Sequence, residues 1–185
     1  MRSLTGQCIE EVRASIMGIE GAASTLYWQG VSIVTGGSVF VKRVQQDPGD
    51  PFNASLNYGY GILYSRMSAC LQNAGLDPYA GFLHTDRPGK TSLVFDMVEE
   101  FRQPAVDRAL IALFNRTPQG IVMQEGLLDM RSRKMVAGAV LTALERKAMH
   151  GHSDLSLGSV IQSQARALAS YLRGETLYKG YRFRW

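Results

Sequence analysis

Residues 47–75 read DPGDPFNASLNYGYGILYSRMSACLQNAG and contain both a start signal and a stop signal for a helix. Asp50 stands where an N-cap residue is expected, and Pro51 suits the first helical turn, in which its missing N–H is not needed. Gly75 suits the position that follows a helix, where the backbone often turns left-handed. The pattern therefore predicts one long helix between Asp50 and Gly75.

The segment before this helix also has helical periodicity. From about residue 4 to residue 29, apolar side chains recur at steps of three and four and predict an amphipathic helix. The members of this stripe are Cys8, Val12, Ile16, Ile19, Ala23 and Leu26. Gly18 and Gly21 interrupt the helix, which indicates a reason such as a close backbone approach. Residues 30–46 are β-branched and rich in glycine, and they predict either a short hairpin or an ordered loop.

The rest of the chain is predicted to form a loop followed by further helices. Residues 77–90, DPYAGFLHTDRPGK, predict a loop by their Pro and Gly content. Ser92 can cap the next helix, which should run towards Arg102 and break or kink at Pro104. Helical periodicity returns at about 105–116, 130–149 and 157–173. We therefore expect a single, mainly α domain that comprises residues 1–185.

Composition limits the function classes. A chain of 185 residues with 45% hydrophobic and 19% charged residues can bury one core and is not disordered. No apolar run approaches the roughly 20 residues that cross a bilayer, and the first residues do not look like a signal peptide. Cys8 and Cys70 form no CxxC spacing, which suits a reducing cytosol. We expect a cytoplasmic protein without a membrane partner, and its net charge of +4 favours an anionic partner such as nucleic acid.

Acidic residues gather on the predicted helix that follows His84. Asp96 shares a helix face with Glu99 and Glu100, and the group is either a solvated acidic face that pairs with Arg102 or part of a metal site. In the second interpretation, Glu99 and His84 bind the ion. Carboxylates and an imidazole suit Mn²⁺ or Mg²⁺.

Such a site needs one more carboxylate from elsewhere, and Glu20 is the candidate, so the residues alone leave both interpretations open. His150 and His152 follow a helix in a polar loop, where solvent exposure is the expected state. They therefore carry less weight than His84 as candidates for the metal site.

Four blocks of sequence together resemble one family. The blocks are MGIEGAASTLYW, DPFNASLNYGYGILY, AGLDPYAGFLH and SLVFDMVEEFRQPAVDR, and the chain ends in RGETLYKGYRFRW. Their order and spacing resemble those of the C-terminal helical domain of the Cas1 family, the CRISPR-associated endonuclease/integrase of the adaptation stage, and the end of the chain is also similar.

The resemblance implies a metal site made of Glu20, His84 and Glu99. Asp96 matches an acid that supports this site, and Tyr64 matches an aromatic residue that lies beside it. The implied reaction is phosphoryl transfer on DNA with Mn²⁺ or Mg²⁺, in which a spacer 3′-hydroxyl or a water molecule attacks a phosphodiester at the CRISPR array. The implied function is therefore that of a metal-dependent DNA nuclease and integrase in antiviral defence.

The resemblance also implies partners and a missing part. The partners are protospacer and repeat DNA, the small adaptation protein Cas2 and, in the full-length protein, a second copy of the chain. Family members usually carry an N-terminal β-rich domain, which we expect to be absent from these 185 residues. Candidate phosphate contacts are Arg87, Lys90, Arg102, Lys179, Arg182 and Arg184. Tyr178, Tyr181 and Trp185 either stack on bases or pack on the helical core.

Three alternatives belong to other classes. The chain could be a non-catalytic DNA-binding or assembly fragment, although the complete acid–histidine–acid set argues against this. It could be a transposon-borne integrase relative with the same site. A helical-bundle metalloprotein of oxidative chemistry would need Glu-x-x-His motifs, and the sequence contains none.

Overall fold

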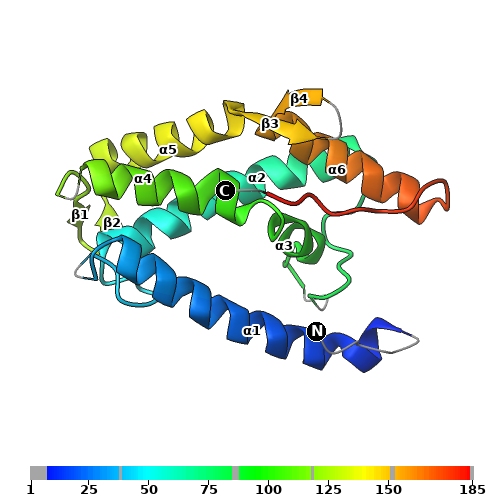
Figure 1. The fold of residues 1–185 in the computed structure, drawn as a ribbon, viewed down its shortest axis with the longest axis horizontal. Helices are drawn as coiled ribbons and strands as arrows, with labels where there is room; N and C mark the ends of the chain where they lie inside the picture. The colour runs from blue at the N-terminus through cyan, green and yellow to red at the C-terminus, as the bar shows by residue number, and fades with distance from the viewer. Residues whose placement is uncertain (1–7, 38, 85–87, 118, 151–152, 184–185) are drawn as a thin grey trace.

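The computed structural model describes residues 8–37, 39–84, 88–117, 119–150 and 153–183, and it is mainly helical, as predicted (Figure 1). The helices, in chain order, are α1 (Ile9–Val34), α2 (Pro51–Asn73), α3 (Ser92–Val98), the π-helical turn η1 (Gln103–Asp107), α4 (Arg108–Arg116), α5 (Met130–Glu145) and α6 (Leu157–Leu172). Two antiparallel hairpins, β1 (Met123–Gln124) with β2 (Leu127–Leu128) and β3 (Lys147–His150) with β4 (Ser153–Ser156), connect later helices. The helical periodicity did not predict these hairpins, and α5 ends before the predicted residue 149.

Helix α2 is the centre of the fold. Its N-cap is confirmed, because the Asp50 carboxylate accepts a hydrogen bond from the Asn53 N–H at 2.8 Å. Gly75 follows the helix with a φ of +77°, as the stop signal predicted. The helix packs against α3, α5 and α6, and Phe52 and Leu63 are fully buried. α2 is therefore the helix around which the body, α2–α6, is built.

One glycine allows a close approach inside this core. A Cβ atom at Gly59 would lie 2.8 Å from Cγ1 of Val106, which is shorter than real contacts allow. A side chain at position 59 would therefore force Val106 to shift where α2 packs against η1.

The segment from α3 to α4 turns at residues 99–101 and continues through η1, and the predicted N-cap of α3 was wrong. Ser92 is the first residue of α3 and Thr91 occupies the N-cap position, where its side chain makes no capping hydrogen bond. The helix ends at Val98, before the predicted Arg102, and the regular α-helix is interrupted around Pro104, which lies in η1, where the Arg108 N–H bonds the Gln103 carbonyl in a wider π turn. Apolar residues of this segment are buried, with Val94 of α3 at 1% and Phe101 in the following turn at 0% exposure.

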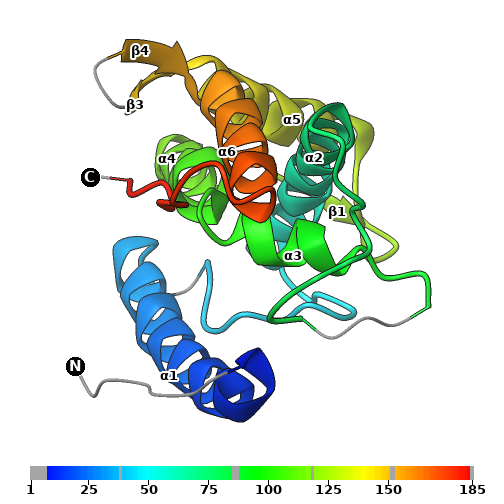
Figure 2. The same ribbon diagram turned by 90° about the vertical axis from the view of Figure 1, so that its right-hand side faces the viewer.

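Helix α1 differs most from its prediction. It continues to Val34, so the first residues of the predicted hairpin or loop are helical. The predicted apolar stripe is not a buried face, since Ile19 and Leu26 are 57% and 70% exposed, whereas Trp28 and Val31 are buried. The expected close approach at the interior glycines is also not found among the described residues, because no atom outside the local backbone of the helix lies within 4 Å of a Cβ built at Gly18 or Gly21. Figure 2 shows α1 beside the body rather than within it.

No helix among the described residues combines the length and apolar character that crossing a membrane requires.

Candidate metal and nucleic-acid site

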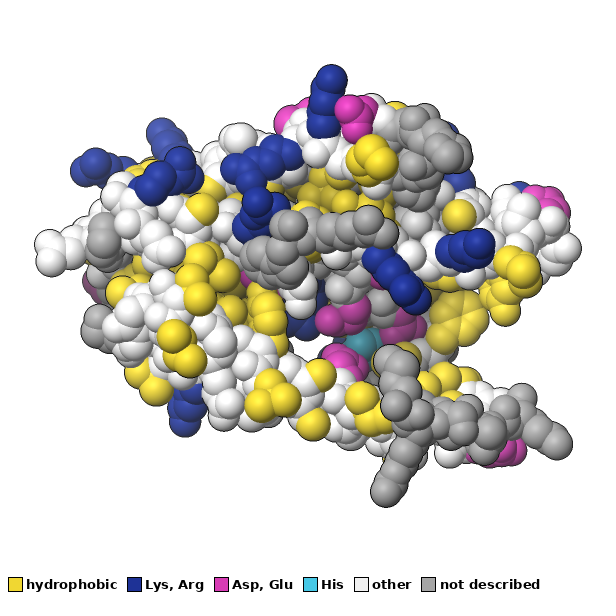
Figure 3. Space-filling view, viewed as in Figure 1, with side chains coloured by type: hydrophobic (Ala, Val, Ile, Leu, Met, Phe, Trp, Pro, Cys, Tyr) yellow, Lys and Arg dark blue, Asp and Glu magenta, His cyan; other side chains and the backbone are white. Residues whose placement is uncertain are grey.

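A pocket of about 600 Å³ lies between α1 and the body. In Figure 3, acidic side chains and a histidine gather in the hollow between α1 and the helices above it. Its lining combines acids, cations and aromatic rings from segments that are far apart in the sequence. The residues are Met17, Glu20, Arg43, Gln45, Asn57, Tyr60, Tyr64, Leu83, His84, Lys90, Ser92, Phe95, Glu99 and Arg102.

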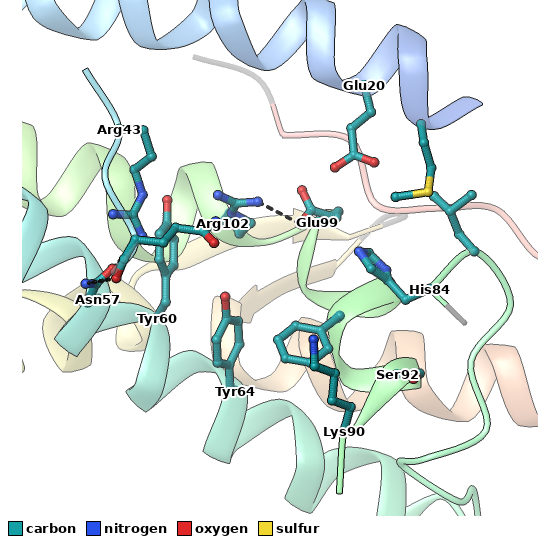
Figure 4. A pocket seen from close by; sticks show the side chains of 14 residues that line it. Glu20, Arg43, Asn57, Tyr60, Tyr64, His84, Lys90, Ser92, Glu99 and Arg102 are labelled. Carbon is teal, nitrogen blue, oxygen red and sulfur yellow. Dashed lines mark hydrogen bonds and ion pairs between the residues drawn. The ribbon is translucent and has the colours of Figure 1, made fainter. Parts of the chain in front are cut away.

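The three expected metal ligands face this pocket from three segments. Glu20 comes from α1, His84 from the loop before α3, and Glu99 from the turn after α3. In Figure 4, Glu20 points from α1 across the pocket towards Glu99 and His84. The donor set, two carboxylates and one imidazole, has the chemistry that Mn²⁺ and Mg²⁺ accept.

The donors face one another without forming a closed shell. Within the described part of the chain, no three Asp, Glu, His or Cys side chains are close enough together to hold a metal ion as they stand. The donor chemistry therefore fits a divalent cation, and Glu20, His84 and Glu99 would have to converge on it.

Asp96 organises the loop that carries His84. Its Oδ2 accepts hydrogen bonds from the N–H groups of Phe82 and Leu83, at 2.6 and 3.0 Å. Its Oδ1 accepts one from the His84 N–H at 3.0 Å and lies 2.6 Å from His84 Nδ1. Because Asp96 uses Nδ1, the ring nitrogen Nε2 remains for another ligand.

The same loop is packed tightly against the start of α3. A Cβ atom at Gly81 would lie 2.5 Å from the Ser92 Cβ and 2.7 Å from the His84 carbonyl oxygen. A side chain at position 81 would therefore displace the loop that presents His84.

Glu99 also makes the ion pair that the acidic-face interpretation predicted. Arg102 Nη1 donates to Glu99 Oε1 at 2.8 Å, and the guanidinium lies 4.7 Å from the centre of the Tyr60 ring. The Glu99 side chain is 39% exposed and that of Arg102 is 21% exposed. The pair holds the Glu99 carboxylate at the pocket and leaves it accessible to a ligand.

The sequence analysis did not identify Arg43 as a pocket residue. Its guanidinium donates to Asn57 Oδ1 at 2.6 Å and to Asn53 Oδ1 at 3.1 Å, and it lies 5.5 Å from the Tyr60 ring centre. Burial lowers the pKa of Arg43 from its usual value. Arg43 falls in residues 30–46, where no clear secondary structure was predicted, so no local signal placed it beside the acids.

Asp107 is a second residue that the sequence analysis missed. Its carboxylate is 2% exposed and accepts hydrogen bonds from Tyr60 and, at 2.8 Å, from Tyr27. Burial raises the pKa of Asp107 to about 6, and the two hydroxyls together with Arg102 and Arg43 limit the rise. Asp107 lines a smaller pocket that is also lined by Glu20 and Glu99. This buried carboxylate therefore lies next to the candidate site.

Aromatic rings form one wall of the pocket. Tyr64 meets Phe95 edge to face at 5.3 Å between ring centres, and Phe95 lies 5.9 Å from the His84 ring. Burial raises the pKa of Tyr64, so it presents a neutral hydroxyl. Tyr64 thus lies beside the candidate ligands, in the place that the resemblance implied.

The cationic candidates are in different places. Lys90 and Arg102 line the pocket, while Lys179 and Arg182 are exposed on the C-terminal segment. Four residues named from the sequence, Arg87, His152, Arg184 and Trp185, lie outside the described residues, as does the side chain of His150.

Two aromatic residues of the C-terminal segment, Tyr178 and Tyr181, pack on the body. Tyr178 Oη donates to Glu100 Oε1 at 2.6 Å, and the Tyr181 N–H donates to Glu100 Oε2 at 2.7 Å. The Tyr181 ring stacks on Phe101, 5.3 Å between centres and 5° from parallel. Of the two interpretations of these tyrosines, packing on the core is the one observed.

Known proteins are similar to this chain in sequence and in fold. The family model described as CRISPR associated protein Cas1 matches residues 2–142. A CRISPR-associated endonuclease Cas1 from Archaeoglobus fulgidus is 35% identical, over 97% of this chain and 55% of its own length. The chain spans about half the length of the curated relatives it matches.

Two solved structures have a similar fold. A casposase bound to integration product has a TM-score of 0.82 and 27% identity, over 93% of this chain and 53% of its own. A chain of a Cas6-RT-Cas1–Cas2 complex has a TM-score of 0.77 and 25% identity, over 92% of this chain and 20% of its own.

Proposed function

Because the chain belongs to the Cas1 family of CRISPR-associated proteins, we propose that it is the catalytic helical domain of a metal-dependent DNA endonuclease and integrase. Its reaction is phosphoryl transfer, in which a spacer 3′-hydroxyl or a water molecule attacks a phosphodiester of the CRISPR repeat. One observation carries the proposal: Glu20, His84 and Glu99, from three separate segments, line one pocket together with cationic side chains.

The proposed ligands of Mn²⁺ or Mg²⁺ are Glu20, His84 and Glu99. When bound, a divalent cation would supply Lewis-acid stabilisation of the charge that develops at phosphorus. Asp96 fixes the orientation of His84 and determines which ring nitrogen is available. Glu99 is paired with Arg102 and is partly exposed, so its carboxylate can exchange the guanidinium for a divalent metal ion.

The substrate side of the pocket suits a DNA backbone. Arg102 and Lys90 are the proposed phosphate contacts, and Arg43 adds a third positive charge to the same pocket. Tyr64 and Phe95 offer an aromatic wall against which a sugar or base can pack. Acids and cations therefore share one pocket, as an enzyme needs when it binds both a metal ion and a phosphodiester.

The partners belong to the proposal as well. A solved complex with a similar chain contains Cas1 and Cas2, which supports an assembly of this protein with Cas2 and DNA. We expect homodimerisation in the full-length protein.

The casposase with a similar fold, solved with an integration product, favours a second candidate function, the integration of mobile DNA with the same residues. The two candidate functions differ in the DNA that the protein requires as substrate and target. CRISPR adaptation needs repeat DNA as the target and is stimulated by Cas2, whereas a mobile-element integrase joins the ends of its own element without Cas2.

A strand-transfer and cleavage assay tests the proposed function. Linear and branched DNA are incubated with the protein and Mn²⁺ or Mg²⁺, with and without Cas2. We expect joining or cleavage that disappears in His84→Ala and Glu20→Gln, while thermal unfolding stays unchanged. Glu145→Gln, at an exposed glutamate of α5, is the matched control and should keep wild-type activity. If His84→Ala retains most of the activity, the assignment is wrong.

A further inference from the structure

Helix α1 carries Glu20 and contacts the body through apolar residues near its end and through polar side chains along its length. Two of its residues, Trp28 and Val31, are buried, while Ile19, Leu26 and Ile33 are more than half exposed. The buried pair lies after Glu20, near the end of the helix. Among the described residues, no apolar side chain is fully buried in the part of α1 that presents Glu20 to the pocket.

Three polar residues of α1 lie on one face. Arg13, Glu20 and Tyr27 are seven residues apart, and two helical turns bring such positions back to the same side. Glu20 lies midway between the other two. This face is turned towards the body, because Arg13 and Tyr27 both bond to residues far away in the sequence.

The first contact joins α1 to the loop of His84. Arg13 Nε donates to the Leu83 carbonyl at 3.1 Å, and Nη2 donates to the Phe82 carbonyl at 3.0 Å. The N–H groups of the same two residues are bound by Asp96. Arg13 therefore couples the helix of Glu20 to the loop that carries His84.

The second contact joins α1 to the core. Tyr27 Oη donates to Asp107 Oδ2 at 2.8 Å, and Asp107 also accepts the hydroxyl of Tyr60 from α2. Asp107 is 2% exposed, so a lost hydroxyl partner would leave a carboxylate oxygen less well bonded in a buried place. The Tyr27–Asp107 pair therefore fixes the helix on the other side of Glu20.

We propose that Arg13 and the Tyr27–Asp107 pair are positioning residues that hold Glu20 opposite His84 and Glu99. The proposal rests on the metal site of the proposed function. Its consequence is that either contact can be removed without unfolding the body. The third ligand then becomes poorly placed, and the metal ion binds more weakly.

The test compares Tyr27→Phe and Arg13→Gln with the wild type. Each variant removes hydrogen bonds and keeps most of the packing. The matched control is Tyr58→Phe, which removes the hydroxyl of a tyrosine that lies on α2 outside the metal pocket and is 39% exposed. Two quantities are measured: the dissociation constant of Mn²⁺, by electron paramagnetic resonance, and the amide hydrogen exchange of α1 and α2.

We expect Mn²⁺ to bind about 10- to 100-fold more weakly in Tyr27→Phe and Arg13→Gln, the range found for residues that orient metal ligands. Amides of α1 around Glu20 should exchange faster, and those of α2 should be unchanged. A purely structural role would instead speed exchange in both helices. Wild-type Mn²⁺ affinity in both variants would overturn the proposal.

Failure of the proposed function would look different. The wild type would then show no Mn²⁺ site that depends on Glu20, while exchange in α1 would still rise in Tyr27→Phe and Arg13→Gln.

Discussion

Helices α1 and α2 form opposite walls of the same pocket, and they are held in different ways. Helix α2 begins with a formed cap and buries apolar residues such as Phe52 and Leu63 completely. Helix α1 is longer, yet it exposes most of its apolar residues and turns Arg13, Glu20 and Tyr27 to the body. Two proposed ligands, His84 and Glu99, belong to the body, whereas the third belongs to α1. The difference indicates that stability resides in α2 and that the completeness of the metal site depends on α1.

The largest effect on stability should come from the core of α2. Leu63→Ala removes a side chain that is 0% exposed and leaves a cavity among its neighbours. We expect the free energy of unfolding to fall by about 2–5 kcal/mol, measured by urea denaturation. A loss below about 1 kcal/mol, the range of conservative core swaps, would show that α2 is not the rigid wall described above.

An intermediate effect should appear at Asp107, which joins the two walls. Burial raises its pKa in the fold to about 6, so the folded protein binds this proton more tightly than the unfolded chain does. This contribution favours the fold at low pH and is lost as pH rises through about 6. The rise in pKa is limited by the groups that stabilise the charged carboxylate, which are Tyr27, Tyr60, Arg102 and Arg43.

Asp107→Asn removes that titration. Between pH 7 and pH 4, the stability of the wild type relative to Asp107→Asn should increase by roughly 1–3 kcal/mol, as follows from about 1.4 kcal/mol per pKa unit. Denaturant titrations at several pH values measure it. A difference that does not change with pH would mean that Asp107 titrates normally in the fold.

The smallest effect should come from the outer face of α1. Leu26 is 70% exposed, so Leu26→Ser should change the free energy of unfolding by no more than about 0.5 kcal/mol. Thermal unfolding of the isolated chain is a sufficient measurement. A decrease of more than about 1 kcal/mol in the free energy of unfolding would mean that the outer face of α1 is packed, as the core face of α2 is, and would contradict the difference between the two helices.

The sequence predicted α2 well because its signals are local. Asp50, Pro51 and Gly75 act within a few residues of the helix ends, and the structure confirms each of them. The buried face of α1 was predicted wrongly, because an apolar stripe normally faces the core. In this helix the polar residues face the body, and their partners are 69 to 80 residues away.

The sequence also predicted some residues of the candidate site and missed others. The residues alone offered Glu20, His84 and Glu99 as one of two interpretations, and the family resemblance favoured that one and added Tyr64. The structure brings these four residues to one pocket, with Asp96 behind His84. Their chemical roles remain proposals.

Arg43 and Asp107 were missed, because their significance comes from long-range contacts. The hydrogen bonds of Arg43 to Asn57 and of Asp107 to Tyr27 have no counterpart in a local pattern.

A Mn²⁺ titration followed by electron paramagnetic resonance tests most directly that Glu20, His84 and Glu99 form one metal site. The wild type should show a saturable site that is lost in each of Glu20→Gln, His84→Ala and Glu99→Gln, and retained in Glu145→Gln. Unchanged Mn²⁺ binding in any one of the three ligand variants would contradict a shared site across the two walls of the pocket.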